Sequence, residues 1–232
     1  VSSGPKTITD EELIKEEEVV ITLTRGGYIK RTVPQTFRTQ KRGGKGVIAI
    51  ETREEDMVVS LVTANTHDDL LFFTNQGKVY QIKVYEIPEV SRVARGKPLV
   101  SLLALTSDER VTAVLAISKR KRSGIGLIVL MTRRGIMKRV EAKEFSNLRR
   151  NGLVAIKLPK EDELTWARYS SGRDTVLMVT KLGQSLRFKE TDIRTLSRQA
   201  AGVRAIRLKE NDELVGMDVV GSDSDWKKRE IL

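Results

Sequence analysis

A tetrapeptide of the form Thr-x-x-Gly recurs four times along this 232-residue chain, and its spacing constrains the fold more than any other feature. The copies read TRGG, TNQG, TRRG and TKLG and end at Gly27, Gly77, Gly135 and Gly183, which lie 50, 58 and 48 residues apart. An apolar run precedes each copy, and a run that contains basic residues follows it. Two such runs joined by a short turn that ends in glycine are typical of a β-hairpin. The sequence therefore predicts four hairpins.

Two further landmarks follow each hairpin at nearly constant distance. The first is a loop that ends in glycine, 17 to 19 residues after the hairpin glycine, and leads into a short strand; its glycines are Gly46, Gly96, Gly152 and Gly202. The second is an acidic turn before a longer strand, as in EEDMVVSLV and NDELVGMDVV. Each repeat thus supplies about four strands in about fifty residues, the size of a propeller blade. The sequence predicts an all-β fold, and the longest spacing reflects an insertion, SKRKRSGIG, at residues 118–126.

The repeat also predicts domain boundaries. We expect a single domain over residues 19–232, with blades at roughly 19–67, 68–122, 123–172 and 173–222 and the start of a fifth blade, or an exchanged strand, at 223–232. Residues 1–18 are acidic and form a solvated linker or one short helix, since Thr9 and Glu12 have the spacing of a capping box. The chain does not begin with methionine, so we expect it to be part of a longer protein.

The charge of the chain favours a polyanionic partner. It has 42 Lys and Arg against 31 Asp and Glu, a net charge of +11 and a pI of about 9.9. Basic surfaces bind nucleic acid because cations release the counterions condensed on a phosphate backbone; the alternative is an inert basic surface. No apolar run approaches the length of a membrane span, so we expect no membrane partner and a cytoplasmic location.

No catalytic, metal or cofactor site emerges from the sequence. The stretch RGGKG suggests a nucleotide-binding loop, but that motif requires glycine where Thr39 stands and a hydroxyl residue where Gly46 stands. His67, the only histidine, lies in a polar turn, and the absence of cysteine excludes disulfides and cysteine-based zinc sites. The carboxylates recur once per repeat at the acidic turns, which indicates a role in turn geometry. We expect a fragment without an active site or a bound cofactor.

The cations gather at the loop glycines of all four repeats. If the repeats are arranged radially, these loops share one circular track, and such a track suits a curved DNA duplex. The glycines at 43, 44 and 46 allow backbone N–H groups to approach a phosphate closely, and such contacts hold DNA without reading its sequence. The candidate DNA-binding residues are the loop cations Lys41, Arg42, Lys45, Arg95, Lys97, Arg149, Arg150, Arg198 and Arg204, with the hairpin pairs Lys30 and Arg31 and Lys138 and Arg139.

One of these loops closely resembles a known signature. The heptapeptide Gln40, Lys41, Arg42, Gly43, Gly44, Lys45, Gly46, here called the box, resembles the Q-R-R-G-G-[RK]-G motif of the C-terminal domain of the DNA gyrase A family. Lys41 is the one departure, since the family form has arginine there; it keeps the charge and loses the bidentate geometry. The flanking segments ITDEELI and GGYIKRT are similar to the family too.

The resemblance implies a β-pinwheel, a propeller-like domain whose blades exchange strands with their neighbours and commonly number six. It also implies that DNA wraps around a basic rim, that the box is needed for wrapping, and that the wrap lets the parent type II topoisomerase introduce negative supercoils. The implied partners are double-stranded DNA and, in a heterotetramer, the ATPase B subunit together with the rest of the gyrase A subunit. ATP and Mg would serve only that parent enzyme, the isolated domain would be a monomer, and the location would be the bacterial nucleoid.

Two alternatives remain open from the sequence. The repeat alone is shared with the related C-terminal domain of topoisomerase IV, which would direct DNA substrate preference; the loops SRVARGKP, LRRNG and SRQAAGVR are degenerate as boxes, while the intact first box favours gyrase. A propeller-type protein-interaction module is the alternative from a different class, and it predicts binding to a protein that salt does not weaken.

Overall fold

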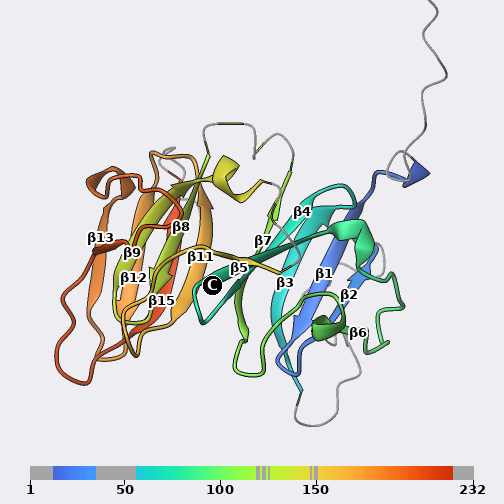
Figure 1. Ribbon diagram of the computed structural model, residues 1–232, viewed down its shortest axis with the longest axis horizontal. Helices are drawn as coiled ribbons and strands as arrows, with labels where there is room; N and C mark the ends of the chain where they lie inside the picture. The colour runs from blue at the N-terminus through green and yellow to red at the C-terminus, as the bar shows by residue number, and fades with distance from the viewer. Residues whose placement is uncertain are drawn as a thin grey trace, which may run out of the picture. The chain divides into compact units, whose positions relative to one another are not determined.

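The computed structural model describes residues 13–34, 56–118, 121, 124, 126–146, 148 and 151–221. Strands and short 3₁₀ helices, joined by turns and loops, form this part of the chain (Figure 1). The strands are β1 (Glu18–Thr24), β2 (Tyr28–Thr32), β3 (Val58–Asn65), β4 (Asp69–Thr74), β5 (Lys78–Lys83), β6 (Lys97–Pro98), β7 (Val111–Ile117), β8 (Leu127–Thr132), β9 (Ile136–Glu141), β10 (Leu153–Val154), β11 (Leu164–Ser170), β12 (Thr175–Thr180), β13 (Ser185–Lys189), β14 (Val203–Arg204) and β15 (Leu214–Val220). The 3₁₀ helices are η3 (Val84–Glu86), η4 (Leu99–Ser101), η5 (Ala142–Phe145) and η6 (Glu190–Asp192).

The strands form one antiparallel sheet per repeat. The strand orders are β3-β1-β2-β6, β10-β5-β4-β7 and β11-β8-β9-β14, and the fourth sheet has three described strands in the order β13-β12-β15. In the first three sheets the outermost short strand belongs to the following repeat: β6 pairs with β2, β10 with β5 and β14 with β9. The all-β fold of propeller-like blades that exchange strands, predicted from the sequence, is confirmed.

Two compact units make up the chain. Among the described residues, the first unit lies within Val1–Leu70 and Ile82–Leu103, and the second within Leu71–Gln81 and Ala104–Leu232. The first unit contains the β1 sheet, and the second contains the β8 and β12 sheets with most of the β4 sheet. The single domain and the blade boundaries expected from the sequence stay predictions, and residues 223–232 and most of 1–18 lie outside the described residues.

The Thr-x-x-Gly tetrapeptides close all four hairpins in the same way. The N–H of the glycine donates to the carbonyl of the threonine at 2.9 to 3.1 Å, and each glycine has a φ between +74° and +84°. Such a left-handed conformation favours glycine. The threonines are buried, and the hydroxyl oxygens of Thr24, Thr132 and Thr180 accept the N–H four residues later. Both ends of the tetrapeptide are therefore required by the turn.

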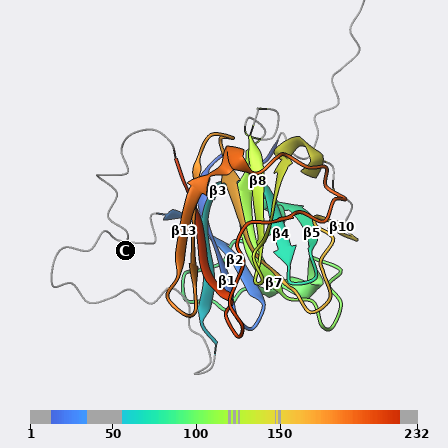
Figure 2. The same cartoon turned by 90° about the vertical axis from the view of Figure 1, so that its left-hand side faces the viewer.

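Within the second unit, two apolar cores lie on either side of the β8 sheet. One packs this sheet against the β4 sheet through residues such as Ile128, Phe73 and Phe145, and the rings of the two phenylalanines meet edge to face with centroids 5.8 Å apart. The other packs it against the β12 sheet through residues such as Met131 and Met178. Figure 2 shows the chain turned so that β13 of this unit faces the viewer. Among the described residues, no helix is long and apolar enough to cross a membrane.

Candidate nucleic-acid interface

The box, residues 40–46, lies outside the described residues, as do Arg149 and Arg150 of the third repeat. Their predicted contacts with DNA therefore stay predictions. The remaining candidates fall into two groups, the hairpin cations Lys30, Arg31, Lys138 and Arg139 and the loop cations Arg95, Lys97, Arg198 and Arg204.

The two hairpin lysines lie inside the protein. Lys30 and Lys138 have no exposed surface, and Lys138 donates through Nζ to the carbonyl oxygens of Ala155 and Ala200 at 2.8 Å and to that of Arg198. Lys30 donates in the same way to the carbonyl oxygens of Arg92 and Ala94. Burial lowers the pKa of both lysines, that of Lys138 to about 8. Because both ammonium groups are enclosed by the protein, neither reaches a DNA phosphate in this conformation.

The two hairpin arginines are also engaged within the protein. Arg139 is 6% exposed and forms an ion pair with the fully buried Glu190. The side chain of Arg31 is 14% exposed and pairs with Glu89 at 3.4 Å. The Lys-Arg pairs thus bind the segment that the next repeat contributes. These contacts within the protein explain why the pairs recur at matching positions, and no contact with DNA is needed for that explanation.

The loop cations of the first unit are exposed. Residues 91–96, here called the first exchange loop, run beside β2 and lead into β6. Arg95 and Lys97 are exposed, and the guanidinium of Arg95 lies 3.7 Å from the centre of the Tyr28 ring. Gly96 has a φ of +88°, and a Cβ there would lie 2.5 Å from the carbonyl oxygen of Ile29. The glycine allows the loop to lie directly against β2.

The second unit repeats this arrangement. Residues 197–202, the second exchange loop, run beside β9 and lead into β14, whose Arg204 is exposed. Arg198 is half-buried, and its Nη1 donates to the carbonyl of Val154 at 2.8 Å. Gly202 has a φ of +87°, and a Cβ there would lie 2.8 Å from the carbonyl oxygen of Met137. Exposed cations therefore lie on the first loop and the strand after it, Arg95 and Lys97, and on the strand after the second loop, Arg204.

Sequence reasoning missed a group of exposed cations on the fourth sheet and the segment after it. Arg187 and Lys189 lie on β13, where exposed and half-buried residues alternate, and Arg194 follows η6. The signal was the period of two in the strand SLRFK, which puts its two cations on one face.

The acidic turns hold the hairpin turns in place. Asp162 accepts the N–H of Arg134 at 3.1 Å, and Asp212 accepts the N–H of Leu182 at 3.0 Å. Asp56 does the same for Gly26 in the first unit at 2.7 Å. Although burial opposes it, these backbone hydrogen bonds lower the pKa of Asp56 and of Asp212. The prediction that the recurring carboxylates serve turn geometry is confirmed.

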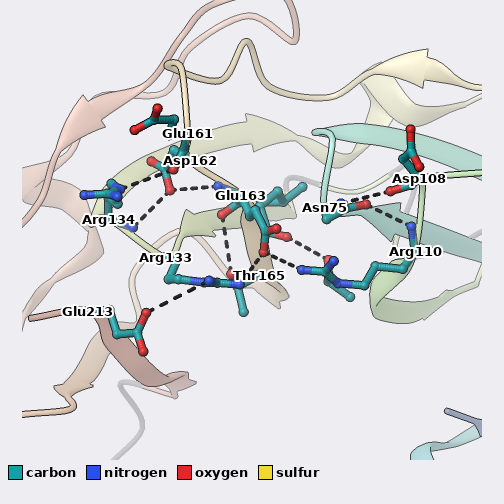
Figure 3. A network of polar contacts seen from close by, with 12 residues as sticks. Asn75, Asp108, Arg110, Arg133, Arg134, Glu161, Asp162, Glu163, Thr165 and Glu213 are labelled. Carbon is teal, nitrogen blue, oxygen red and sulfur yellow. Dashed lines mark hydrogen bonds and ion pairs between the residues drawn. The ribbon is translucent and has the colours of Figure 1, made fainter.

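A row of ion pairs joins these turns in the second unit (Figure 3). Arg110 contacts Glu163 at 2.6 Å, Glu163 also contacts Arg133, and Arg133 lies 4.0 Å from Glu213, which Lys181 approaches to 3.5 Å. The row borders a hollow of about 1040 Å³ whose lining contains six basic and six acidic residues. Because the charges balance, the hollow as a whole is a poor site for a polyanion, although Arg204 is among its lining residues. The described residues hold no cluster of His, Cys, Asp or Glu that could bind a metal ion.

Comparison with known proteins points to one family. The model of the family described as DNA gyrase C-terminal domain, beta-propeller, matches residues 18–65, 68–118, 126–171 and 174–221. The A subunit of DNA gyrase from Staphylococcus aureus strain COL is 44% identical over 221 residues, and so is that of strain MRSA252. The alignments cover 95% of this chain and 25% of the relatives, so the chain spans about a quarter of their length.

Two solved structures share the fold. The C-terminal domain of DNA topoisomerase IV superimposes with a TM-score of 0.73 at 26% identity, over 90% of this chain and 63% of that one. The DNA gyrase A C-terminal domain superimposes with a TM-score of 0.72 at 29% identity, over 88% of this chain and 65% of that one.

Proposed function

Because this chain belongs to the DNA gyrase C-terminal domain family, we propose that it binds double-stranded DNA without sequence preference and bends it along its exchange loops. The observation that carries the proposal is the presence of exposed cations at or directly after both exchange loops, although at different positions of the repeat: Arg95 and Lys97 in the first unit and Arg204 in the second. The exposed Arg187, Lys189 and Arg194 would contact DNA as well, whereas the hairpin lysines and arginines would serve the interior of the protein.

The box extends this set to the first repeat. Counted back from the loop glycines Gly46 and Gly96, Arg42 takes the place of Arg92 and Lys45 that of Arg95. We therefore expect residues 40–46 to contact DNA phosphates together with the other loops, and Arg149 and Arg150 to do so in the third repeat.

The parent protein would be a bacterial type II DNA topoisomerase of the cytoplasm that introduces negative supercoils. In it, this domain would act with the rest of the gyrase A subunit, and with the ATPase B subunit. ATP and Mg would bind to those other parts, since the stretch RGGKG of this domain departs from a nucleotide loop at Thr39 and Gly46.

The proposal is tested by fluorescence energy transfer between the ends of a duplex of about 40 base pairs, which is too short to bend on its own. Bending such a duplex costs several kcal/mol, and many phosphate contacts must offset it, so we expect the ends to approach at low salt and to separate as salt rises. Replacing residues 40–46 by alanine should reduce bending more than binding. If the ends do not approach at low salt, the domain does not bend DNA.

The topoisomerase IV domain is the second candidate, because its fold superimposes as well as that of the gyrase domain. The two functions are separated by the activity of the whole parent enzyme on relaxed plasmid. The gyrase function predicts negative supercoiling with ATP that is lost when this domain is deleted.

A further inference from the structure

The buried lysines Lys30 and Lys138 hold two loops of the same sequence pattern. The first exchange loop reads SRVARG and the second SRQAAG, so both have the form S-R-x-A-x-G. Each lysine stands three residues after its hairpin glycine, Gly27 or Gly135, and its loop begins about sixty residues later in the chain. In both loops the carbonyl oxygens of the Arg and the Ala of the pattern accept hydrogen bonds from the ammonium group.

The second repeat provides the contrast. Tyr80 occupies the lysine position there, since it stands three residues after Gly77. Its hydroxyl donates to Glu109 at 2.8 Å, and its ring lies beneath Gly152, where a Cβ would come within 2.6 Å of Cε1. The loop before Gly152 reads NLRRNG and lacks the S-R-x-A pattern. Within this one chain, the pattern occurs in the described loops that face a buried lysine.

The ammonium groups fix the direction of four backbone N–H groups. A trans peptide is planar, so its N–H points opposite to its C=O, and the described residues contain no cis peptide. Because the carbonyls of Arg92 and Ala94 point at Lys30, the N–H groups of Val93 and Arg95 point away from it. The same reasoning directs the N–H groups of Gln199 and Ala201 away from Lys138.

These N–H groups are available to a ligand. Val93, Arg95, Gln199 and Ala201 are exposed residues, and none of their N–H groups finds an acceptor within the described part of the chain. Each loop is braced by one internal bond of 3.1 Å, from Ala94 to Ser91 or from Ala200 to Ser197. Outward backbone N–H groups in a turn can bind an anion, as the successive N–H groups of a nest do; here the two groups of each loop are separated by the residue whose N–H braces the turn.

We propose that the first and second exchange loops are two equivalent phosphate-binding sites for the DNA backbone, each formed by two outward N–H groups and oriented by a buried lysine. The N–H donors are those of Val93 and Arg95 in one loop and of Gln199 and Ala201 in the other. The buried charge adds to the positive potential of the loop, and Arg95 and Arg204 flank the sites. Lys30 and Lys138 are positioning residues, which act on phosphate only through the loops. This inference rests on the proposed DNA binding.

The first test is an NMR titration of the 232-residue chain with a short duplex at low salt. The amide signals of Val93, Arg95, Gln199 and Ala201 should shift, and their exchange with solvent should slow. The amides of Lys160 and Glu161, in an exposed turn outside both loops, serve as the reference. If the duplex binds and the four loop amides move no more than the reference, the sites do not exist, although DNA binding stands. If the duplex does not bind, the proposed function itself is wrong.

The second test uses the two loops as controls for each other. Lys138→Met should abolish the shifts at Gln199 and Ala201 and leave those at Val93 and Arg95, and Lys30→Met should do the reverse. Each variant should weaken DNA binding by about tenfold, as expected when several hydrogen bonds to a charged group are lost. Lys160→Met removes an exposed charge of the same kind and should weaken binding less than about twofold. Equal losses in all three variants would assign the effect to net charge and overturn the positioning role.

The lysine variants are informative only if they fold, and a backbone substitution provides a test that does not require removal of a buried lysine. Replacing Ala201 by lactic acid exchanges its N–H for an ester oxygen, keeps every side chain, and weakens without removing the Ala200 carbonyl that accepts Lys138. We expect this variant to lose several-fold in DNA affinity and to keep its thermal unfolding temperature within a few degrees. Unchanged affinity in the ester variant would show that this N–H does not contact phosphate.

Discussion

Arg139 and Glu190 form an ion pair inside the second unit, with 3.2 Å between Nε and Oε2 and exposed side-chain fractions of 8% and 0%. Arg139 lies on β9, and Glu190 begins η6 in the following repeat. The carboxylate also accepts the hydroxyl of Ser170 at 2.8 Å and the N–H of Asp174 at 2.7 Å. The pair therefore ties one hairpin to the segment that the next repeat contributes.

Replacing Glu190 by alanine should lower the free energy of unfolding by about 3–5 kcal/mol, because it leaves the guanidinium of Arg139 buried without its counter-charge. Urea unfolding measures the effect. The double variant Arg139→Met with Glu190→Met removes both charges and should be less destabilised than Glu190→Ala. A cost below about 1 kcal/mol for Glu190→Ala would mean that water reaches the pair.

Two glycines of the second unit allow a matched test of the close approach between an exchange loop and its neighbouring strand. Gly183 and Gly202 have φ values of +79° and +87°, but a Cβ at Gly183 meets nothing within 4 Å, whereas one at Gly202 meets the carbonyl of Met137 at 2.8 Å. Gly183→Ala should cost about 1–2 kcal/mol, for backbone strain alone. Gly202→Ala should cost more and should also weaken DNA binding, because the loop must move off β9. Equal losses of stability in urea would contradict the close packing of the loop.

Tyr80 should resist ionisation as long as the chain is folded. Burial and the carboxylate of Glu109, which accepts its hydroxyl at 2.8 Å, raise the pKa of Tyr80 well above its usual value. The protonated hydroxyl therefore contributes stability that is present below pH about 10 and lost as pH rises beyond it. An absorbance titration should find one of the four tyrosines silent until unfolding, and Tyr80→Phe should remove that delayed step. Four tyrosines that ionise together near pH 10 would contradict the buried hydrogen bond.

The repeat architecture could be predicted because each landmark has a local cause. The hairpin glycines have a positive φ, and a hairpin threonine such as Thr132 accepts a backbone N–H of the turn with its hydroxyl oxygen. Both residue types therefore recur wherever the turn recurs. The aspartates of the acidic turns accept backbone N–H groups of the hairpin turns. An aspartate with this role must stand at nearly the same distance from its hairpin in each repeat. The exchange of strands between blades, in contrast, was expected only from the resemblance to the gyrase family. The local sequence pattern does not indicate which hairpin a short strand will join.

The roles of Lys30, Lys138 and Arg139 could not be predicted from the sequence. A lysine or arginine in a strand is expected at the surface, because few charged residues are fully buried. What encloses Lys138 is a set of carbonyls, two of which come from a loop about sixty residues further along the chain. Such long-range partners leave no local trace. The recurring S-R-x-A-x-G pattern opposite each lysine was visible in the sequence and could be interpreted only with the contacts known.

The titration of Lys138 should appear in the stability of the chain. Burial lowers its pKa from 10.5 to about 8, so that above pH 8 the folded chain releases a proton that the unfolded chain still holds. The unfolded state binds more protons in this range, and stability therefore rises with pH from about 8 to about 10.5. The groups that face the ammonium are the backbone carbonyls of its loop and of Ala155, the carboxylate of Glu144, which raises the pKa, and the guanidinium of Arg198, which lowers it.

Lys138→Met isolates this contribution, because every other titrating group is shared by the two proteins. In urea unfolding series from about pH 7 to about pH 10.5, the native chain should gain up to about 3 kcal/mol relative to Lys138→Met as pH rises. Lys160→Met, which removes an exposed lysine, should run parallel to the native chain over the same range. If the difference between the native chain and Lys138→Met stays constant with pH, the ammonium keeps an ordinary pKa, and the carbonyls around it compensate fully for its burial.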